Sequence, residues 1–309
     1  MDEDNWPDSI RAGQTQQHEP LVRRVLAPNP SPYTFTGTQT WLVGAGSEIA
    51  VIDPGPAGSG LSVGDPLQPN DANGEGHVEA ILRAVGTAKV TAILCTHTHR
   101  DHSPAAAPLK QATGAPIIGC APLALTDTGP RADSAFDPDY NPDHVLADGE
   151  QVTGAGWTLE AVATPGHTSN HLCYALTQSG ALFTGDHVMK WSTSVVSPPD
   201  GDMAAYMASL QKLYEREDAV YYPAHGPAIT KPKQLVRGMI GHRRQRERQI
   251  LKCLGDGPQA IADMVAVMYK GLDPRLNGAA GRSVLAHLID LQRRGVTVAE
   301  GESWRLIDA

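Results

Sequence analysis

The stretch Thr96-His97-Thr98-His99-Arg100-Asp101-His102 holds three imidazoles and one carboxylate in the spacing H-x-H-x-D-H. It follows Val90-Thr91-Ala92-Ile93-Leu94, an apolar run that is typical of a buried strand, so the cluster lies where a strand gives way to a loop. Imidazole nitrogens and carboxylate oxygens are ligands that zinc accepts. This spacing predicts a metal site at a strand end, and it is too specific for a chance group of solvated residues.

Three later segments repeat the same design. Each has a short apolar run, then a glycine or proline, and a histidine or aspartate beside that turn. The segments are Thr164-Pro165-Gly166-His167, Leu182-Phe183-Thr184-Gly185-Asp186 and Tyr222-Pro223-Ala224-His225-Gly226. Four strand ends that deliver His or Asp predict one edge of a sheet sandwich at which loops converge.

The order H-x-H-x-D-H, T-P-G-H, G-D and P-x-H-G resembles the motifs of the metallo-β-lactamase superfamily of dinuclear hydrolases, over most of residues 30–230. The resemblance implies an α/β chain of the α+β kind, folded as an αββα sandwich. It also implies two metal sites with one bridging residue. The first ion would be bound by His97, His99 and His167, the second by Asp101, His102 and His225, with Asp186 between them.

The implied cofactor is two zinc ions per chain, with iron or manganese as alternatives. Two ions that share a water lower its pKa, so the expected nucleophile is a metal-bound hydroxide. Asp101 and Asp186 would then serve catalysis as well as binding. Dedicated β-lactamases of the superfamily lack an aspartate at the place of Asp186, so the pattern is closer to thioesterases, lactonases and nucleases.

Three further side chains accompany these motifs. Asp53, in Val51-Ile52-Asp53-Pro54-Gly55, matches the superfamily's first motif and would orient a ligand imidazole by accepting its other N–H; the alternative is an ordinary turn residue. His171 would either donate a proton to the leaving group or bind the developing oxyanion, or only support a ligand by a hydrogen bond. His187 would point to the opposite face from Asp186, which favours a structural role.

Length and composition set the class of protein. The chain has 309 residues, which is long enough for one large domain and a small one. Its formal net charge is −9. Its cysteines, Cys95, Cys120, Cys173 and Cys253, form no C-x-x-C pair, so neither a disulfide framework nor a cysteine zinc site is indicated. An acidic start without an apolar run, and no stretch of about 18 apolar residues, predict a cytoplasmic protein without a membrane span.

The organisation along the chain predicts three parts. Residues 1–35 are polar and proline-rich and are expected to begin as a loose tail with a first strand region; residues 36–230 would form the metallo-β-lactamase domain and residues 231–309 a small C-terminal domain. A hairpin is expected over 38–52 and a helix over 77–86. The broken segments 54–76 and 126–149 are expected to be loops, either as substrate walls or as solvated insertions.

The C-terminal part differs in charge and pattern. From residue 231 onward fourteen Lys or Arg face eight acids, a charge of +6 that leaves −15 for the rest. A long arginine-rich helix over 233–254, a helix around 261–268, another around 284–291 and a hairpin over 296–307 resemble a winged-helix module. Such a module either binds nucleic acid or only packs, and Arg243, Arg244, Arg246 and Arg248 would form either a nucleic-acid patch or a solvated helix face.

Two segments narrow the resemblance. His242–Leu251 and Trp191–Met203 resemble the lactamase-β-like protein 2 group, which combines the αββα domain with a winged-helix-like tail and includes a single-strand-selective endoribonuclease. The leading expectation is a hydrolase of a small ester-like substrate (a thioester, lactone or related compound). Single-stranded RNA cleavage is the alternative, although a body of charge −15 repels a polyanion.

Two other classes stay open at this stage. One is an iron-bound oxygenase of sulfur compounds on the same scaffold, and the other is a non-catalytic nucleic-acid binder with a vestigial metal site. All seven expected ligands are present, which disfavours the second class. Assembly as a homodimer is left open.

Overall fold

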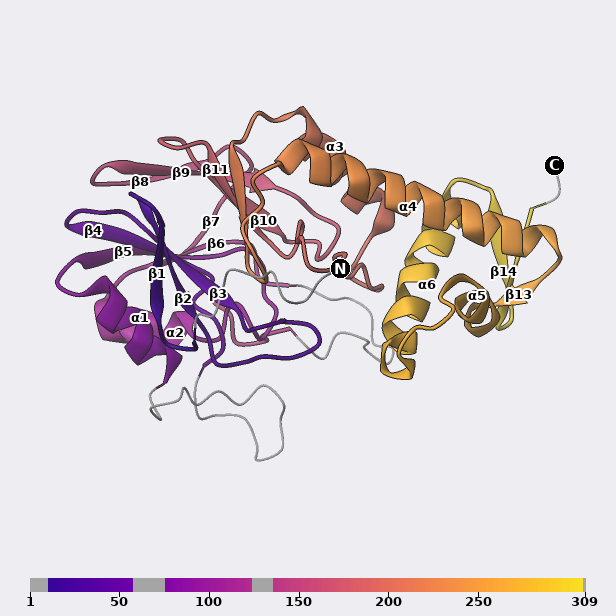
Figure 1. Cartoon of the computed structure of the whole chain (residues 1–309), viewed down its shortest axis with the longest axis horizontal. Helices are drawn as coiled ribbons and strands as arrows, with labels where there is room; N and C mark the ends of the chain where they lie inside the picture. Colours follow the sequence, from indigo (N-terminus) through magenta and orange to yellow (C-terminus); the bar gives the residue numbers. More distant parts are fainter. Residues whose placement is uncertain (1–10, 58–75, 124–135, 308–309) are drawn as a thin grey trace.

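The computed structural model describes residues 11–57, 76–123 and 136–307. Two β-sheets pack face to face, with helices on their outer faces, and a smaller helical part extends from one end (Figure 1). This is the αββα sandwich with a C-terminal domain that the motifs implied. The predicted loop over 54–76 falls largely outside the described residues; of the predicted loop over 126–149, residues 136–149 are described and include one short strand, His144–Val145.

The first sheet has the order β1-β2-β3-β4-β5-β6-β7, and the second has the order β12-β11-β10-β9-β8. A third sheet, β13-β15-β14, belongs to the C-terminal part. The strands are β1 (Thr15–Glu19), β2 (Val22–Leu26), β3 (Gln39–Val43), β4 (Glu48–Ile52), β5 (Lys89–Cys95), β6 (Ile117–Gly119), β7 (His144–Val145), β8 (Gln151–Gly154), β9 (Trp157–Ala163), β10 (Leu172–Leu176), β11 (Ala181–Gly185), β12 (Val220–Pro223), β13 (Gln259–Ala260), β14 (Thr297–Glu300) and β15 (Ser303–Leu306).

Helices cover both sheets. Apolar residues of α1 and α2 join the core of the first sheet, and those of α3 join the core of the second. The helices are α1 (His77–Val85), α2 (Ala106–Thr113), α3 (Met203–Glu215), α4 (Pro232–Gly255), α5 (Ile261–Met268), a short 3-10 turn (Pro274–Leu276) and α6 (Asn277–Arg293). The hairpin β3–β4, helix α1 and the C-terminal helices and wing confirm the elements expected from the sequence pattern.

Aromatic residues fill the space between the two sheets. Trp41, Trp157 and Phe183 are fully buried there, and the rings of Trp41 and Phe183 lie 5.8 Å apart. The strands that carry Trp41 and Phe183, β3 and β11, are buried along their whole length because each is covered on both faces. Burial of this apolar surface is the main stabilising term of the sandwich.

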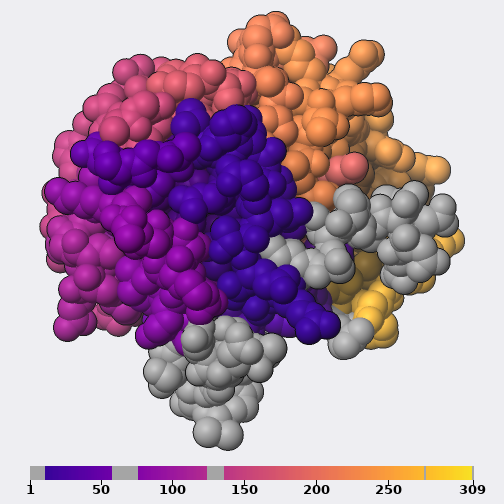
Figure 2. All heavy atoms as spheres, turned by 60° about the vertical axis from the view of Figure 1, so that its left-hand side comes forward, coloured from indigo at the N-terminus to yellow at the C-terminus, as the bar shows by residue number. Residues whose placement is uncertain are grey.

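The segment 1–35 was expected to begin as a loose tail and to contain a first strand region; its beginning lies outside the described residues. Strands β1 and β2 pair with each other, and β2 pairs with β3, so they extend the first sheet. In the space-filling view these strands (indigo) form one continuous surface with the segments that follow (Figure 2). The edge strand β1 is polar because it buries only part of its surface: Thr15–Glu19 is exposed or half-buried throughout.

Helix α4 belongs to two cores. Val236, Met239 and Ile240 pack with α3 against the second sheet, whereas Ile250 and Leu254 pack with α5 and α6. The C-terminal part is therefore continuous with the sandwich through one long helix (Figure 1). A separate domain that begins at residue 231 remains a prediction.

Within the described residues, no helix is both long enough and apolar enough to cross a membrane.

Candidate metal centre

The strand directions explain why residues distant in sequence meet. Strands β4 and β5 are parallel, so the residues that follow them lie at the same edge of the first sheet. In the second sheet β9, β11 and β12 run in one direction, because β10 is antiparallel to β9 and β11 and β11 is parallel to β12. Their carboxyl ends share an edge and carry His167, Asp186 and His225. The predicted convergence of four strand ends is thus built into the topology.

One group of three imidazoles forms at this edge. Nδ1 of His99 lies 3.0 Å from Nε2 of His97 and 3.2 Å from Nε2 of His167. Ligands of a tetrahedral zinc ion at about 2.0–2.1 Å lie about 3.3 Å from one another, so these separations are close to those of a shared ion. Potential ligand atoms of the three residues all lie within 4.8 Å of one another.

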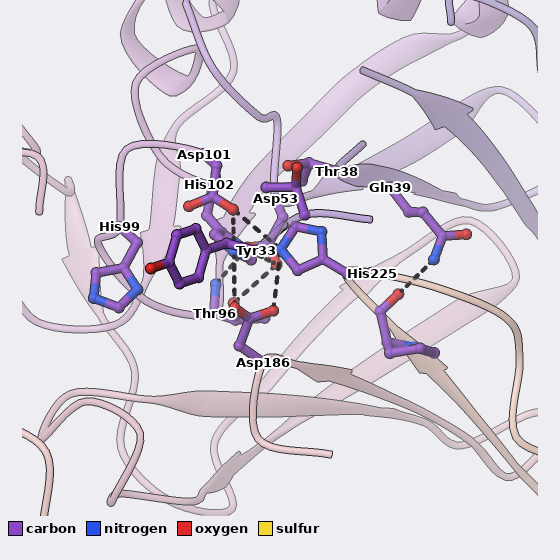
Figure 3. Close-up of polar contacts among 12 residues, drawn as sticks. Tyr33, Thr38, Gln39, Asp53, Thr96, His99, Asp101, His102, Asp186 and His225 are labelled. Carbon is purple, nitrogen blue, oxygen red and sulfur yellow. Dashed lines mark hydrogen bonds and ion pairs between the residues drawn. The ribbon is translucent and has the colours of Figure 1, made fainter. Parts of the chain in front are cut away.

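A second group joins carboxylates to imidazoles. Nε2 of His225 lies 3.0 Å from Oδ2 of Asp101, and Nε2 of His102 lies 3.3 Å from the same oxygen. Asp186 faces both groups: its Oδ1 lies 3.3 Å from His225, and its Oδ2 lies 3.7 Å from both His102 and His167. Figure 3 shows Asp101, Asp186, His102 and His225 turned toward one another. The position of Asp186 is the one that a bridging ligand requires.

The second nitrogen of several imidazoles is held by the protein. Nδ1 of His167 lies 2.6 Å from the carbonyl oxygen of Val195, and Nδ1 of His225 lies 3.4 Å from that of Gly37. A carbonyl can only accept, so these Nδ1 atoms donate and Nε2 keeps its lone pair. Such outer contacts fix the tautomer and the ring orientation that a metal ligand needs.

Asp53 holds His102 in the same way. Its Oδ1 accepts the N–H of Thr96 at 2.7 Å, and its Oδ2 accepts the Thr96 hydroxyl at 2.8 Å and lies 3.0 Å from Nδ1 of His102. The side chain is 1 % exposed, and its φ of 48° is unusual for a residue other than glycine. Three contacts and a strained backbone exceed what an ordinary turn residue needs, so the geometry supports the orienting role.

Two glycines let the neighbouring backbones approach closely. A Cβ on Gly166 would lie 2.4 Å from the Tyr206 nitrogen, and one on Gly185 would lie 2.6 Å from Nε2 of His171 and 2.7 Å from the Thr96 hydroxyl. Gly166 precedes His167 and Gly185 precedes Asp186. The glycine in each motif is therefore required by packing around the following residue.

The donor set fits divalent cations. Nε2 of His102, Nε2 of His225 and Oδ1 of Asp186 are buried and have no partner in hydrogen-bonding geometry, although they lie within ion-pair distance of their neighbours. Burial and the neighbouring His167 lower the pKa of His99 to about 3, which keeps the ring neutral. Burial opposes charge on His102, but Asp101, Asp186 and Asp53 raise its pKa well above the usual value. This pocket favours positive charge, as a cation site must.

His171 and His187 lie behind the centre. The His171 ring is 5.2 Å from that of His97, its Nδ1 contacts the Thr164 hydroxyl at 2.9 Å, and it is 1 % exposed. It is not among the residues that line the cavity above the centre, which disfavours proton donation to a leaving group and favours support of His97. His187 is fully buried with its ring 4.7 Å from that of Tyr206, in keeping with a structural role.

Two of the four α4 arginines considered as a nucleic-acid patch are engaged in contacts within the protein. Arg243 is 4 % exposed, donates to the Ser194 carbonyl and lies 5.1 Å from the centroid of the Tyr206 ring. Arg246 lies 4.1 Å from the Tyr269 ring and donates to the Met268 carbonyl. Arg243 and Arg246 therefore form neither a nucleic-acid patch nor a solvated helix face, the two alternatives expected for the four arginines. Arg244 and Arg248 are exposed.

A cavity of about 320 Å³ opens above the centre. His99, Asp101, His167 and Asp186 line it from below. The other walls come from segments far apart in the sequence, one of which lies within the Trp191–Met203 stretch that carried the resemblance, and the fold brings them together: Pro32, Tyr33, Met189, Trp191, Ser192, Val195, Ser197, Asp200 and Arg282.

Comparison with known proteins agrees with the motifs. Residues 33–225 match the family model of the metallo-beta-lactamase superfamily, and residues 260–304 match that of the beta-lactamase associated winged helix domain. A beta-lactamase-like protein 2 homolog of Drosophila melanogaster is 32 % identical over 89 % of this chain and 88 % of its own length. A fungal protein of Cryptosporiopsis, named atrochrysone carboxyl ACP thioesterase, is 31 % identical over 82 % of this chain and 73 % of its own.

Solved structures share the fold. A beta-lactamase domain protein from Burkholderia ambifaria superposes with a TM-score of 0.78 at 20 % identity, over 97 % of this chain and 96 % of that one. A metallo-beta-lactamase family protein from Thermus thermophilus gives 0.73 at 22 % identity, over 94 % and 99 %. The family models and the relatives of similar length lead to one conclusion: the chain belongs to the metallo-beta-lactamase superfamily, together with the beta-lactamase-like protein 2 homologues, and is a hydrolase with an associated winged helix domain.

Proposed function

We propose that this hydrolase cleaves ester-like carbonyl compounds, with thioesters as the first class to test, at a centre of two divalent ions. The observation that carries the proposal is the placement of two ligand groups, joined by Asp186, at the floor of a largely apolar cavity. The thioesterase name of several relatives supports the same class of substrate.

The assignment of ligands follows the two groups. His97, His99 and His167 would hold one ion, Asp101, His102 and His225 the other, and Asp186 both. When bound, the two ions would lower the pKa of a water molecule to near neutrality and polarise the carbonyl oxygen under attack. Zinc is the metal we expect from the nitrogen-rich donor set, with iron and manganese as alternatives.

The chain's own residues perform the remaining tasks. Asp53 and the carbonyls of Val195 and Gly37 keep the imidazoles oriented. The apolar side chains of Met189, Trp191 and Val195 would bind the body of the substrate and exclude bulk water from the reacting carbonyl. Exclusion of water strengthens each electrostatic contact at the centre.

Single-stranded RNA is the comparison substrate. The tail carries net positive charge, but Arg243 and Arg246 are engaged in contacts within the protein and are not free to bind phosphates. The fold therefore weakens the strongest sequence argument for RNA.

Turnover by zinc-loaded protein on thiophenyl thioesters, simple lactones and a single-stranded RNA, measured side by side, tests the proposal. Asp186→Ala, purified identically, controls for contaminating activity, since it removes the residue that faces both ligand groups. We expect thioester cleavage that is absent in the variant. RNA cleavage alone, or ester cleavage that survives in the variant, would overturn the proposal.

A further inference from the structure

The C-terminal part supplies one wall of the cavity above the metal centre. Arg282 lies on α6, within the segment that matches the winged helix model, yet it lines the same cavity as His99, Asp101 and Asp186. Among the described residues that line this cavity, it is the only lysine or arginine. A cationic side chain from one domain thus reaches the reaction site of the other.

Unlike Arg293 and Arg294 farther along the chain, Arg282 has no hydrogen-bond or ion-pair partner among the described residues. Its Nε is buried and has no hydrogen-bond partner, and no ion pair joins it to a carboxylate of the described residues. By contrast, Arg293 pairs with Asp202, and Arg294 pairs with Glu247 and Asp290. A guanidinium donor that is buried without an acceptor is costly, so its position favours an anionic ligand.

The part of α6 that carries Arg282 is anchored to the sandwich by two residues that follow it, Ser283 and Ala286. The Ser283 hydroxyl accepts from Nη1 of Arg243 at 3.3 Å, and Arg243 is itself anchored to the Ser194 carbonyl. Ala286 packs into the core formed by α3 and the second sheet. These contacts bind α6 to the sandwich and so fix the backbone that carries Arg282 beside the cavity.

The acidic residues of the cavity are engaged elsewhere. Oδ2 of Asp200 accepts the N–H of Ser169 at 2.9 Å, and Asp101 and Asp186 face the imidazoles. The remaining walls of the cavity are mainly apolar and include Tyr33, Met189 and Trp191. Figure 3 shows the Tyr33 ring among the centre's side chains, between those of His99 and His225 in this view. One cavity therefore combines a cationic side chain, apolar wall residues and the candidate metal centre.

We propose that Arg282 is a specificity-determining residue, and that the substrate is an ester or thioester with a carboxylate set apart from the scissile carbonyl by a short apolar chain. The planar guanidinium fork matches a carboxylate with two parallel hydrogen bonds, which a neutral amide cannot accept equally well. The inference rests on the proposed function for the reaction that the substrate undergoes. The binding of a carboxylate by Arg282 does not depend on that function.

The test compares isosteric substrates. The thiophenyl thioesters of glutaric acid and of glutaric acid monoamide differ only in a terminal carboxylate or carboxamide. We expect kcat/KM to favour the carboxylate by about tenfold to a hundredfold, the range of one charge-assisted pair. Arg282→Gln should abolish this preference while the monoamide is cleaved within about threefold of the original rate, and Arg282→Lys should retain part of it.

Arg294→Gln is the matched control, because Arg294 follows the same helix and pairs with Glu247 at the surface. It should leave the preference unchanged. If Arg282→Gln lowers the cleavage of both thioesters equally, Arg282 only supports the structure and the inference is wrong. Equal cleavage of both thioesters by the original protein would also overturn it.

A binding measurement separates this inference from the proposed function. Calorimetric titration with glutarate and with its monoamide should give a Kd lower for glutarate by about tenfold, and Arg282→Gln should remove the difference. If no thioester is cleaved but glutarate binding depends on Arg282, the inference holds and the proposed reaction falls. If thioesters are cleaved but Arg282→Gln leaves the Kd of glutarate unchanged, the inference is wrong and the proposed reaction stands.

Discussion

Replacement of Asp53 by asparagine should weaken the metal centre without touching a ligand. The carboxylate accepts three donors: the N–H and hydroxyl of Thr96 at 2.7 and 2.8 Å, and Nδ1–H of His102 at 3.0 Å. If the asparagine oxygen keeps the hydrogen bond from the Thr96 N–H, its NH₂ group faces the Thr96 hydroxyl and Nδ1 of His102. His102 must then carry its proton on Nε2, the atom that faces Asp101 and Asp186.

The expected loss follows from this change of tautomer. Partners of a ligand imidazole are worth about 10–100-fold in metal affinity, or about 1.4–2.7 kcal/mol. The variant should also unfold more readily, because charge-assisted hydrogen bonds contribute about 1.5–3 kcal/mol each. The assay is competition for zinc between the protein and a chromophoric chelator, with metal content measured after dialysis.

Asp218→Asn is the matched control. Asp218 is a buried carboxylate that accepts two hydrogen bonds from Arg216 at 2.7 and 2.8 Å, at the opposite end of β12 from His225. Its loss should lower stability but leave zinc affinity unchanged. If Asp53→Asn binds zinc as tightly as the original protein, or if Asp218→Asn loses as much affinity, the orienting role of Asp53 is refuted.

Three further outcomes are expected. Gly185→Ala should lower zinc affinity and turnover together, since its Cβ would lie 2.6 Å from His171 and displace Asp186; unchanged metal content after dialysis would contradict this. Arg243→Ala should lower the free energy of unfolding by about 3 kcal/mol in urea titrations, because the Ser194 carbonyl loses its donor and the Tyr206 ring loses its cation. The same change at the exposed Arg244 should alter the free energy of unfolding by less than about 0.5 kcal/mol. Burial, with Arg243 nearby, lowers the pKa of His287 to about 3, so the folded protein keeps this ring neutral while the unfolded chain protonates it below about pH 6.5. Stability from this group is complete above pH 6.5 and is lost as the pH falls toward 3; between pH 6.5 and 5 the loss is about 2 kcal/mol in chelator-treated protein. His287→Leu should remove that loss, since both ring nitrogens lack partners, and an unchanged pH dependence would argue against it.

The metal centre could be predicted from the sequence because its information is local. Each group of ligands follows an apolar run, and His167, Asp186 and His225 also lie beside a glycine, so a strand end is recognisable without knowledge of the fold. The spacing of His97, His99, Asp101 and His102 places four donors on one loop, and the resemblance of the four motifs supplied the superfamily. The structure brings all seven expected ligands together.

Other predictions failed where neighbours decide a residue's role. The strand region expected within residues 1–35 could not be delimited from the sequence, because the edge strand β1 and its neighbour β2 have no apolar run comparable to β5 and are placed by pairing with β3. Arg243 and Arg246 have the pattern of a surface helix, but aromatic rings and carbonyls of other segments bury Arg243 and hold the half-buried Arg246. A repeating pattern along one helix cannot reveal which partners another segment will bring.

The sequence by itself determined the superfamily, the order of the elements and the candidate ligands of the metal centre, because short-range spacing encodes strand ends and ligand sets. Only the tertiary structure decided what surrounds that centre. Tyr33, Trp191 and Arg282 are separated by 158 and 91 residues along the chain, and they share one cavity because the sheets pack face to face and α6 is docked against α3 and α4. Substrate specificity depends on such contacts between distant segments, and no local pattern records them.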